Sequence, residues 1–281
     1  MAPSSEKLTG GYKLLWRVLN APKPIRSGFS RSISSLLYLA QKKRLHKRVQ
    51  TIFPQYDASQ VKAVAKDSTR FACDEIINML QIPAENYRVV GAELLPEAGT
   101  QGAVFASVHI GQTEAPTYAI QQLGHEVCTI IGAGDDNPQL HHLGAAMLEQ
   151  TGLPYLTKNK GILFDLIAKL HKKHCVFIHS DLRDKGPEVE FLGQKTTVPK
   201  TAASLAVLAK VPLYFIYGIR EQDELVVYID KLADVDEVQG LQMPREEALS
   251  LLTQRLVESM EQVIRRYPQY WLWLYNRFRI K

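Results

Sequence analysis

The chain has 281 residues, 46% of them hydrophobic, and is therefore long enough to bury a large core. Its three cysteines, Cys73, Cys128 and Cys175, lie far apart, which argues against a disulfide framework or a cysteine zinc site and favours a reducing compartment. No stretch of about 20 uninterrupted apolar residues occurs, and the basic N-terminus lacks the apolar core of a secretory signal. The sequence therefore predicts neither a spanning helix nor a signal peptide.

The net charge of +5 is unevenly distributed along the chain. Residues 1–50 carry 11 Lys or Arg and one acid, Glu6, and residues 265–281 carry five Lys or Arg and no acid. The residues between them carry 18 basic and 28 acidic side chains. Basic ends on an acidic body point to partners that are themselves charged.

The first 50 residues mix aromatic and aliphatic side chains with cations, and we treat them as a basic amphipathic N-terminal segment preceding one α/β domain over residues 51–281. Such a segment is typical of helices that lie in a membrane interface, with cations toward anionic head groups. The alternative is an amphipathic helix that packs on the protein and whose charges are only solvated.

Helices and strands alternate in the rest of the chain. Asp57 is predicted to cap a helix that runs to about Leu80. Strands are predicted at Tyr87–Val90, Ala103–Val108, Glu126–Ile131, Pro154–Leu156, Cys175–Ile178, Leu213–Tyr217 and, near the sheet edge, Leu225–Ile229, with helices at about 113–123, 138–150, 160–172, 200–210 and 244–266. This order predicts an α/β fold with a mostly parallel central sheet and helices on both faces.

His109 and Glu114 stand where one of these buried strands gives way to a helix. A histidine at the carboxyl end of such a strand, with a carboxylate one helical turn later, is a natural general base with an orienting partner. Spacing alone does not single out this pair, because His179 and Asp184 also follow an apolar run. Either histidine is also interpretable as a hydrogen-bonded loop residue.

A second polar segment follows the strand at Cys175–Ile178 and is expected at the same edge of the sheet as His109. Arg183 or Lys185 is a candidate for binding an anionic group of a substrate, and Asp181 for bracing the loop. Gln112, in the turn after His109, is a further candidate for substrate binding. The alternative is a polar turn that forms its own salt bridges.

Several other kinds of site are not supported by the sequence. There is no phosphate-binding glycine loop and no Gly-x-Ser-x-Gly motif, so neither nucleotide binding nor serine hydrolysis is predicted. His141, His142, His171 and His174 lack a third or fourth ligand at a metal-site spacing, so no metal is expected. The C-terminal aromatics and arginines suit a membrane interface or a polyanion, with core packing of Trp271 and Trp273 on the last helix as the alternative.

Three segments, taken in order, resemble the lysophospholipid acyltransferase superfamily and in particular the late acyltransferases of lipid A. They are the strand with His109-x4-Glu114, the loop at Asp181 with Phe191-Leu-Gly193 behind it, and the ending Tyr267-Pro-Gln-Tyr-Trp-Leu-Trp. Two departures are evident: the N-terminal membrane helix usual in that family is absent, and Ser180-Asp181-Leu182-Arg183 replaces an acid-Gln-acid pattern.

The resemblance implies that His109 and Glu114 form the catalytic centre of an acyltransferase. The donor is then an acyl group on acyl carrier protein or coenzyme A, and the acceptor a hydroxyl of a lipid or glycolipid similar to lipid A. It implies no cofactor and no nucleic acid, and a place at the cytoplasmic face of the bacterial inner membrane. Two alternatives stay open: transfer of an aminoacyl (glycyl) group to lipid A, and a non-catalytic lipid- or membrane-binding protein on the same fold.

Overall fold

The computed structural model describes residues 3–134, 137–222, 224–240 and 243–280. The helices are α1 Gly10–Leu19, α2 Lys23–Ile52, α3 Ala58–Asn78, α4 Ala115–Gln122, α5 Pro138–Thr151, α6 Ile162–His171, α7 Thr201–Ala209, α8 Val235–Gly240 and α9 Arg245–Arg266. The strands are β1 Tyr87–Val90, β2 Ala103–Gly111, β3 Val127–Ile131, β4 Tyr155–Thr157, β5 Cys175–His179, β6 Glu188–Phe191, β7 Gln194–Thr197, β8 Leu213–Glu221 and β9 Glu224–Ala233.

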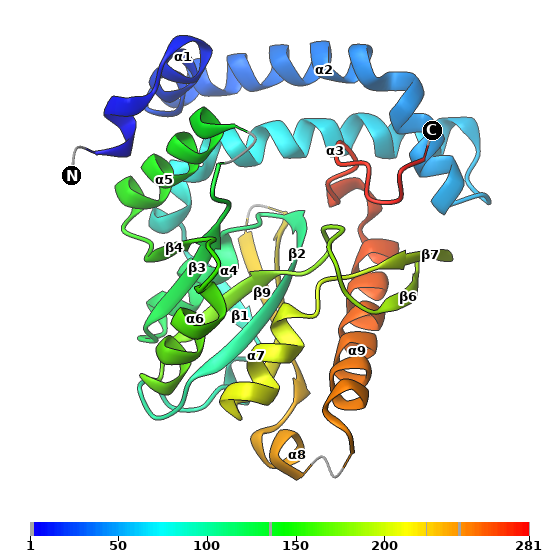
Figure 1. Ribbon diagram of the computed structural model, residues 1–281. Coiled ribbons are helices and arrows are strands. Elements are labelled where there is room, and N and C mark those ends of the chain that lie inside the picture. Colours follow the sequence, from blue (N-terminus) through cyan, green and yellow to red (C-terminus); the bar gives the residue numbers. More distant parts are fainter. Residues whose placement is uncertain (1–2, 135–136, 223, 241–242, 281) are drawn as a thin grey trace.

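Seven of these strands form one sheet in the order β1-β9-β8-β2-β5-β3-β4. All neighbours run parallel except β8 and β9, which form an antiparallel pair. The predicted α/β fold with a mostly parallel central sheet is confirmed, and β2 lies at its centre. The carboxyl end of β2 points toward α3 (Figure 1).

Helices cover both faces of the sheet because its strands are apolar on both sides. One face packs on α6, α7 and α9, through residues such as Val104, Val176 and Phe215. The opposite face packs on α4 and the end of α5, through Phe105, Phe177 and Tyr214, whose rings stack on one another. Burial on both faces explains why these strands appear in the sequence as continuous apolar runs rather than as alternating ones.

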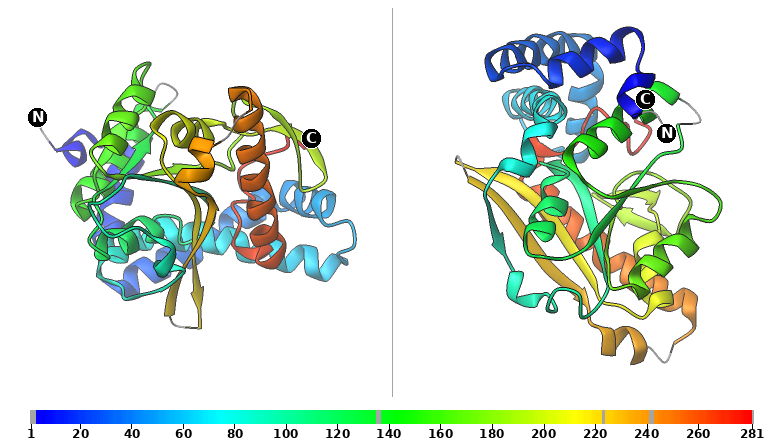
Figure 2. Two further views of the ribbon diagram at one scale, coloured as in Figure 1. Left: turned by 90° about the horizontal axis from the view of Figure 1, so that it is seen from below. Right: turned by 90° about the vertical axis from the view of Figure 1, so that its left-hand side faces the viewer.

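The N-terminal segment forms α1 and α2, and α2 packs along α3. These three helices lie across one end of the sheet, with α2 outermost (Figures 1 and 2). Asp57 caps α3 as predicted: its side chain accepts from the backbone N–H groups of Ser59 and Gln60, and Gln60 closes a capping box. Among the described residues, no helix combines the length and the apolar character that crossing a bilayer requires.

Trp271 and Trp273 pack in the core, as the alternative expected, but they lie in the tail after α9, which ends at Arg266, and not on that helix. This tail turns back beneath α3 as the red segment of Figure 1, with Tyr270 edge-on to Phe71. Trp271 and Trp273 are 4% and 2% exposed. Both tryptophans are therefore core residues, and the prediction that they meet a membrane or a polyanion is wrong, because the end of the sheet offers them an apolar site.

A hairpin formed by β6 and β7 lies where the sequence indicated only a loop. Its turn is Leu192-Gly193, and both residues have positive φ (52° and 74°). Two such residues at a hairpin turn match the right-handed twist of the flanking strands. The strands are too short and too polar to be recognised by alternation, and Leu192 is an unusual residue at such a turn.

Candidate active site

The backbone of β2 carries His109 to the carboxyl edge of the sheet. β2 continues past Val108 to Gly111, and its register with β8 shifts between Ser107 and Gly111. Gly111 has φ +61°, and a Cβ there would lie 2.2 Å from the Gly218 carbonyl oxygen, so no other residue fits this approach of two strands. The carbonyl of His109 also accepts a hydrogen bond from Leu272 N. Both the sheet and the C-terminal segment thus fix the backbone at His109.

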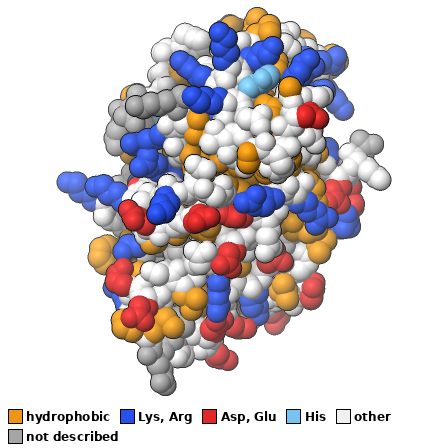
Figure 3. Space-filling model, turned by 90° about the vertical axis from the view of Figure 1, so that its right-hand side faces the viewer, with side chains coloured by type: hydrophobic (Ala, Val, Ile, Leu, Met, Phe, Trp, Pro, Cys, Tyr) orange, Lys and Arg blue, Asp and Glu red, His pale blue; other side chains and the backbone are white. Residues whose placement is uncertain are grey.

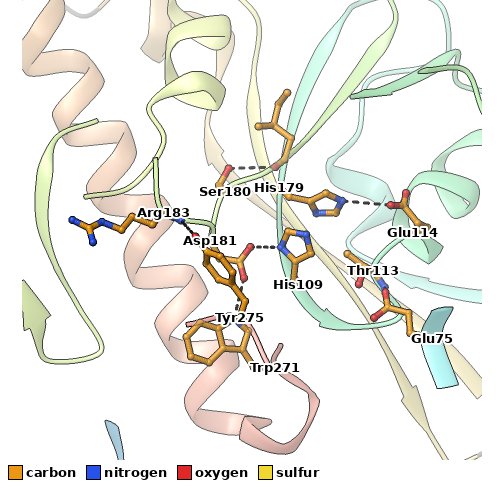
Figure 4. Close-up of polar contacts among 11 residues, drawn as sticks. Glu75, His109, Thr113, Glu114, His179, Ser180, Asp181, Arg183, Trp271 and Tyr275 are labelled. Carbon is orange, nitrogen blue, oxygen red and sulfur yellow. Dashed lines mark hydrogen bonds and ion pairs between the residues drawn. The ribbon is translucent and has the colours of Figure 1, made fainter. Parts of the chain in front are cut away.

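The carboxylate that holds the His109 ring is Asp181, two residues beyond β5. Asp181 is 2% exposed; its Oδ1 lies 2.6 Å from His109 Nδ1, and its Oδ2 accepts from Trp271 Nε1 at 2.9 Å (Figure 4). Burial opposes ionisation of this carboxyl, but His109, Trp271 and His179 outweigh it and lower its pKa to about 2. Asp181 is therefore an acceptor at neutral pH, so the proton of a neutral His109 resides on Nδ1 and its Nε2 is free to take one.

The basicity of His109 depends on the same neighbours. Burial lowers the pKa of His109, while the charge and hydrogen bond of Asp181 raise it, with further contributions from Glu75 and Glu114. The net result is a pKa above the ordinary histidine value. His109 is thus a stronger base than a free imidazole, with one nitrogen committed to Asp181.

Glu114, the predicted partner of His109, pairs instead with His179. Its Oε1 lies 3.6 Å from His179 Nε2, and the rings of His179 and His109 have centroids 4.5 Å apart. The direct His109–Glu114 contact expected from the spacing does not form, because β2 extends past His109 and Glu114, the residue just before α4, lies on the His179 side (Figure 4). The alternative pair of His179 and Asp184 does not form either: Asp184 lies 3.7 Å from Lys158.

A further acid, Glu75 of α3, adjoins this site and escaped the sequence analysis. It accepts a hydrogen bond from Thr113 N at 2.5 Å, in the turn between His109 and Glu114. Burial raises the pKa of Glu75 to about 8, although the hydrogen bond from Thr113 and the charge of His109 both act to lower it. Glu75 lies in the last turn of α3, and no local motif distinguishes it from a solvated helix residue.

A cavity of about 700 Å³ opens beside the two histidines. Its apolar lining comes from β3, β5 and α6 and the loop after β5: Ile130, Ile131, Ile162, Leu163, Leu166, Phe177, Ile178 and Leu182. Three cations, Lys158, Arg183 and Lys200, line it as well. An apolar slot with cations beside a base suits a ligand that has a long apolar part and an anionic part.

The substrate-binding candidates from the sequence occupy different positions around this cavity. Arg183 lines it, although its guanidinium lies on the side of the loop away from His109 (Figure 4). Lys185 lines a neighbouring depression with Lys200. Gln112 forms the turn, where its N–H donates to Gly218 O. Asp181, expected to brace the loop, has both oxygens engaged by His109 and Trp271.

Trp271 is the residue of this site that sequence reasoning misplaced. Its N–H is the second hydrogen bond to Asp181, and Ile110 forms an antiparallel bridge with it. The tryptophan itself was conspicuous, but nothing local in the sequence indicates that the tail crosses the end of β2. Within the described part of the chain, no group of three or more His, Cys, Asp or Glu side chains is arranged to hold a metal ion.

The fold and the site can be compared with known proteins. A solved structure similar to this chain is the 1-acyl-sn-glycerophosphate (LPA) acyltransferase PlsC from Thermotoga maritima, at 10% identity and a TM-score of 0.37, over 83% of this chain and 96% of that chain. No curated protein matches significantly. A family model described as bacterial lipid A biosynthesis acyltransferase matches residues 10–280, nearly the whole chain. The chain therefore belongs to the bacterial lipid A biosynthesis acyltransferase family, and it is an acyltransferase.

Proposed function

We propose that the protein moves an acyl group from a thioester donor to a hydroxyl of a lipid A-like acceptor, with His109 as the general base. The observation that carries the proposal is the chain of contacts from Trp271 through Asp181 to His109 Nδ1, which leaves Nε2 unengaged beside an apolar cavity. A base oriented by a buried carboxylate is the arrangement that proton abstraction from a hydroxyl requires.

The proposed reaction follows from this geometry. His109 Nε2 takes the proton of the acceptor hydroxyl while the hydroxyl oxygen attacks the thioester carbonyl carbon, and Asp181 stabilises the imidazolium that forms. The tetrahedral intermediate collapses, the C–S bond breaks, and the leaving thiolate takes the proton from His109. Glu114 adds negative charge to the site through its pair with His179. No cofactor besides the donor is needed.

The cavity is the proposed site of the donor's acyl chain. Each buried methylene contributes roughly 0.8 kcal/mol, so a chain of ordinary length gains enough from the apolar walls to be held without polar contacts. Lys158, Arg183 and Lys200 are placed to contact the anionic part of a phosphopantetheine or coenzyme A donor. The same apolar walls favour an acyl group over the glycyl group of the alternative.

The outer face of α1 and α2 is the proposed membrane-docking surface. It exposes Leu14, Ile25, Leu36 and Leu39, each between 57% and 68% accessible. Lys and Arg predominate over the part of the molecule formed by α2 and α3, while Asp and Glu gather toward the opposite end (Figure 3). Exposed apolar side chains among cations suit docking on an anionic bilayer, here the cytoplasmic face of the inner membrane.

Mass spectrometry of products tests the proposal directly. Purified protein is incubated with a lipid A acceptor and, separately, with dodecanoyl-coenzyme A, dodecanoyl-acyl carrier protein and a glycyl-carrier thioester. We expect the acceptor to gain the mass of the acyl chain, and His109→Ala to abolish that gain. A gain of the glycyl mass would select the aminoacyl alternative, and lipid binding without transfer from any donor would select the non-catalytic one.

A further inference from the structure

A groove between α2 and α3 stands apart from the catalytic cavity. Its volume is about 450 Å³, and it is lined by Arg31, Ser34, Ser35, Tyr38 and Leu39 of α2 and by Lys62, Lys66 and Arg70 of α3. The three cations of α3 recur every four residues and therefore lie along one face of that helix. Four cations thus surround one small groove.

Few carboxylates compensate these cations. Arg70 lies 3.6 Å from Asp74, which also accepts from Ser30. Among the described residues, Arg31, Lys62 and Lys66 have no carboxylate within ion-pair distance. The positive field is also felt nearby, since burial together with the charges of Lys42 and Lys62 lowers the pKa of His46. The groove therefore has a surplus of positive charge available to a ligand.

The groove borders the exposed apolar face of α2. Leu39 lines the groove and is 68% exposed, and Leu36, one turn earlier, is 64% exposed. If these leucines enter the apolar edge of a bilayer, the groove beside them lies at the depth of the lipid head groups. Charge and depth together fit a phosphate that is attached to a membrane lipid.

We propose that the groove between α2 and α3 is a binding site for the phosphate head group of an anionic membrane lipid, held by Arg31, Lys62, Lys66 and Arg70. Arginine forms two parallel hydrogen bonds to phosphate oxygens, and the lysines add point charges. This proposal rests on the membrane docking proposed above. It adds binding of one specific lipid phosphate to the general attraction between the basic surface and an anionic bilayer. The site orients α2 on the bilayer, with α3 and the catalytic site beneath it.

Flotation of the full chain with vesicles tests the site. The variant K62Q/K66Q is compared with K172Q/K195Q, which removes the same charge from exposed positions just after α6 and on β7. Vesicles contain phosphatidylcholine with phosphatidylglycerol or, at equal surface charge, with oleate, a carboxylate. We expect K62Q/K66Q to weaken binding to phosphatidylglycerol vesicles about 30-fold, and the control to change it less than about threefold. Both variants should melt at the wild-type temperature, since all four lysines are exposed.

Each other outcome contradicts a definite part of this account. The head-group site would be overturned if both variants lost the same affinity for phosphatidylglycerol vesicles. It would also be overturned if the wild-type protein bound oleate vesicles as tightly as phosphatidylglycerol vesicles. Either result would leave membrane docking intact. If K62Q/K66Q bound vesicles as the wild type does but bound acyl carrier protein more weakly, the groove would be assigned to a protein partner. That result would overturn the lipid head-group site as well. Absence of wild-type binding to any vesicle would refute the membrane docking proposed above, and leave acyl transfer to be judged by its own assay.

Discussion

The two histidine–carboxylate pairs at the end of the sheet are held very differently. Asp181 is buried, lies 2.6 Å from His109 and has its second oxygen occupied by Trp271. Glu114 and His179 are 3.6 Å apart, their side chains are each 21% exposed, and Glu114 Oε2 and His179 Nδ1 have no hydrogen-bond partner. Only the first pair combines a short contact with a carboxylate whose two oxygens are both hydrogen-bonded, which is the geometry of an orienting contact. The comparison shows that proximity in sequence does not select the acid that orients a base.

The largest effect is expected when the charge of Asp181 is removed. Asp181→Asn keeps the shape of the side chain but cannot stabilise the imidazolium and can favour the wrong tautomer of His109. We expect kcat to fall about 10²- to 10⁴-fold. Steady-state transfer from the thioester donor measures this, with the exposed Asp165→Asn of α6 as the matched control. A loss of less than threefold in Asp181→Asn would show that His109 does not depend on Asp181.

A smaller effect is expected at Trp271. Trp271→Phe keeps an aromatic side chain, although a smaller one, but removes the N–H that holds Asp181 Oδ2, so the carboxylate loses one of its two anchors. We expect kcat to fall about tenfold, the equivalent of one lost hydrogen bond to a charged group. The control is Trp273→Phe in the same tail, because its N–H donates to the Pro268 carbonyl and not to Asp181. Equal losses of kcat in both variants would assign Trp271 a purely structural role.

The pH profile distinguishes the pairs in another way. His109 must be neutral to act as a base, and its pKa is raised, so kcat/KM should fall as the pH drops through a value above about 6.5. Asp181→Asn removes the main group that raises this pKa, and the acid limb should therefore move to lower pH. A limb that stays in place in Asp181→Asn would mean that the titrating group is not His109.

The smallest effect is expected from Glu114 once His179 is absent. Glu114 contacts His179. In a His179→Ala protein, Glu114→Ala should therefore lower kcat only slightly, by the effect that the charge of Glu114 has without its partner. A double-mutant cycle on kcat measures this coupling. If the two losses were strictly additive, Glu114 would act on His109 without His179.

The sequence allowed the fold to be predicted because the strands of the sheet are buried on both faces and appear as apolar runs such as Ala103–Val108. It also placed His109 and Asp181 at one edge, since both follow neighbouring parallel strands. It did not identify the contact between them, which depends on the register of Ser107 with His179 and on the bulged extension of β2 to Gly111. The contribution of Trp271 depends on a tail more than 150 residues from His109, and no local pattern indicates where that tail lies.

The central claim, that Asp181 rather than Glu114 orients the catalytic base, is tested most directly by comparing two amide variants in one assay. Asp181→Asn and Glu114→Gln each remove one charge with almost no change in shape. At saturating donor and acceptor, kcat should fall at least about tenfold further in Asp181→Asn than in Glu114→Gln. A kcat for Glu114→Gln equal to or below that of Asp181→Asn would contradict the account and restore Glu114 as the partner of His109.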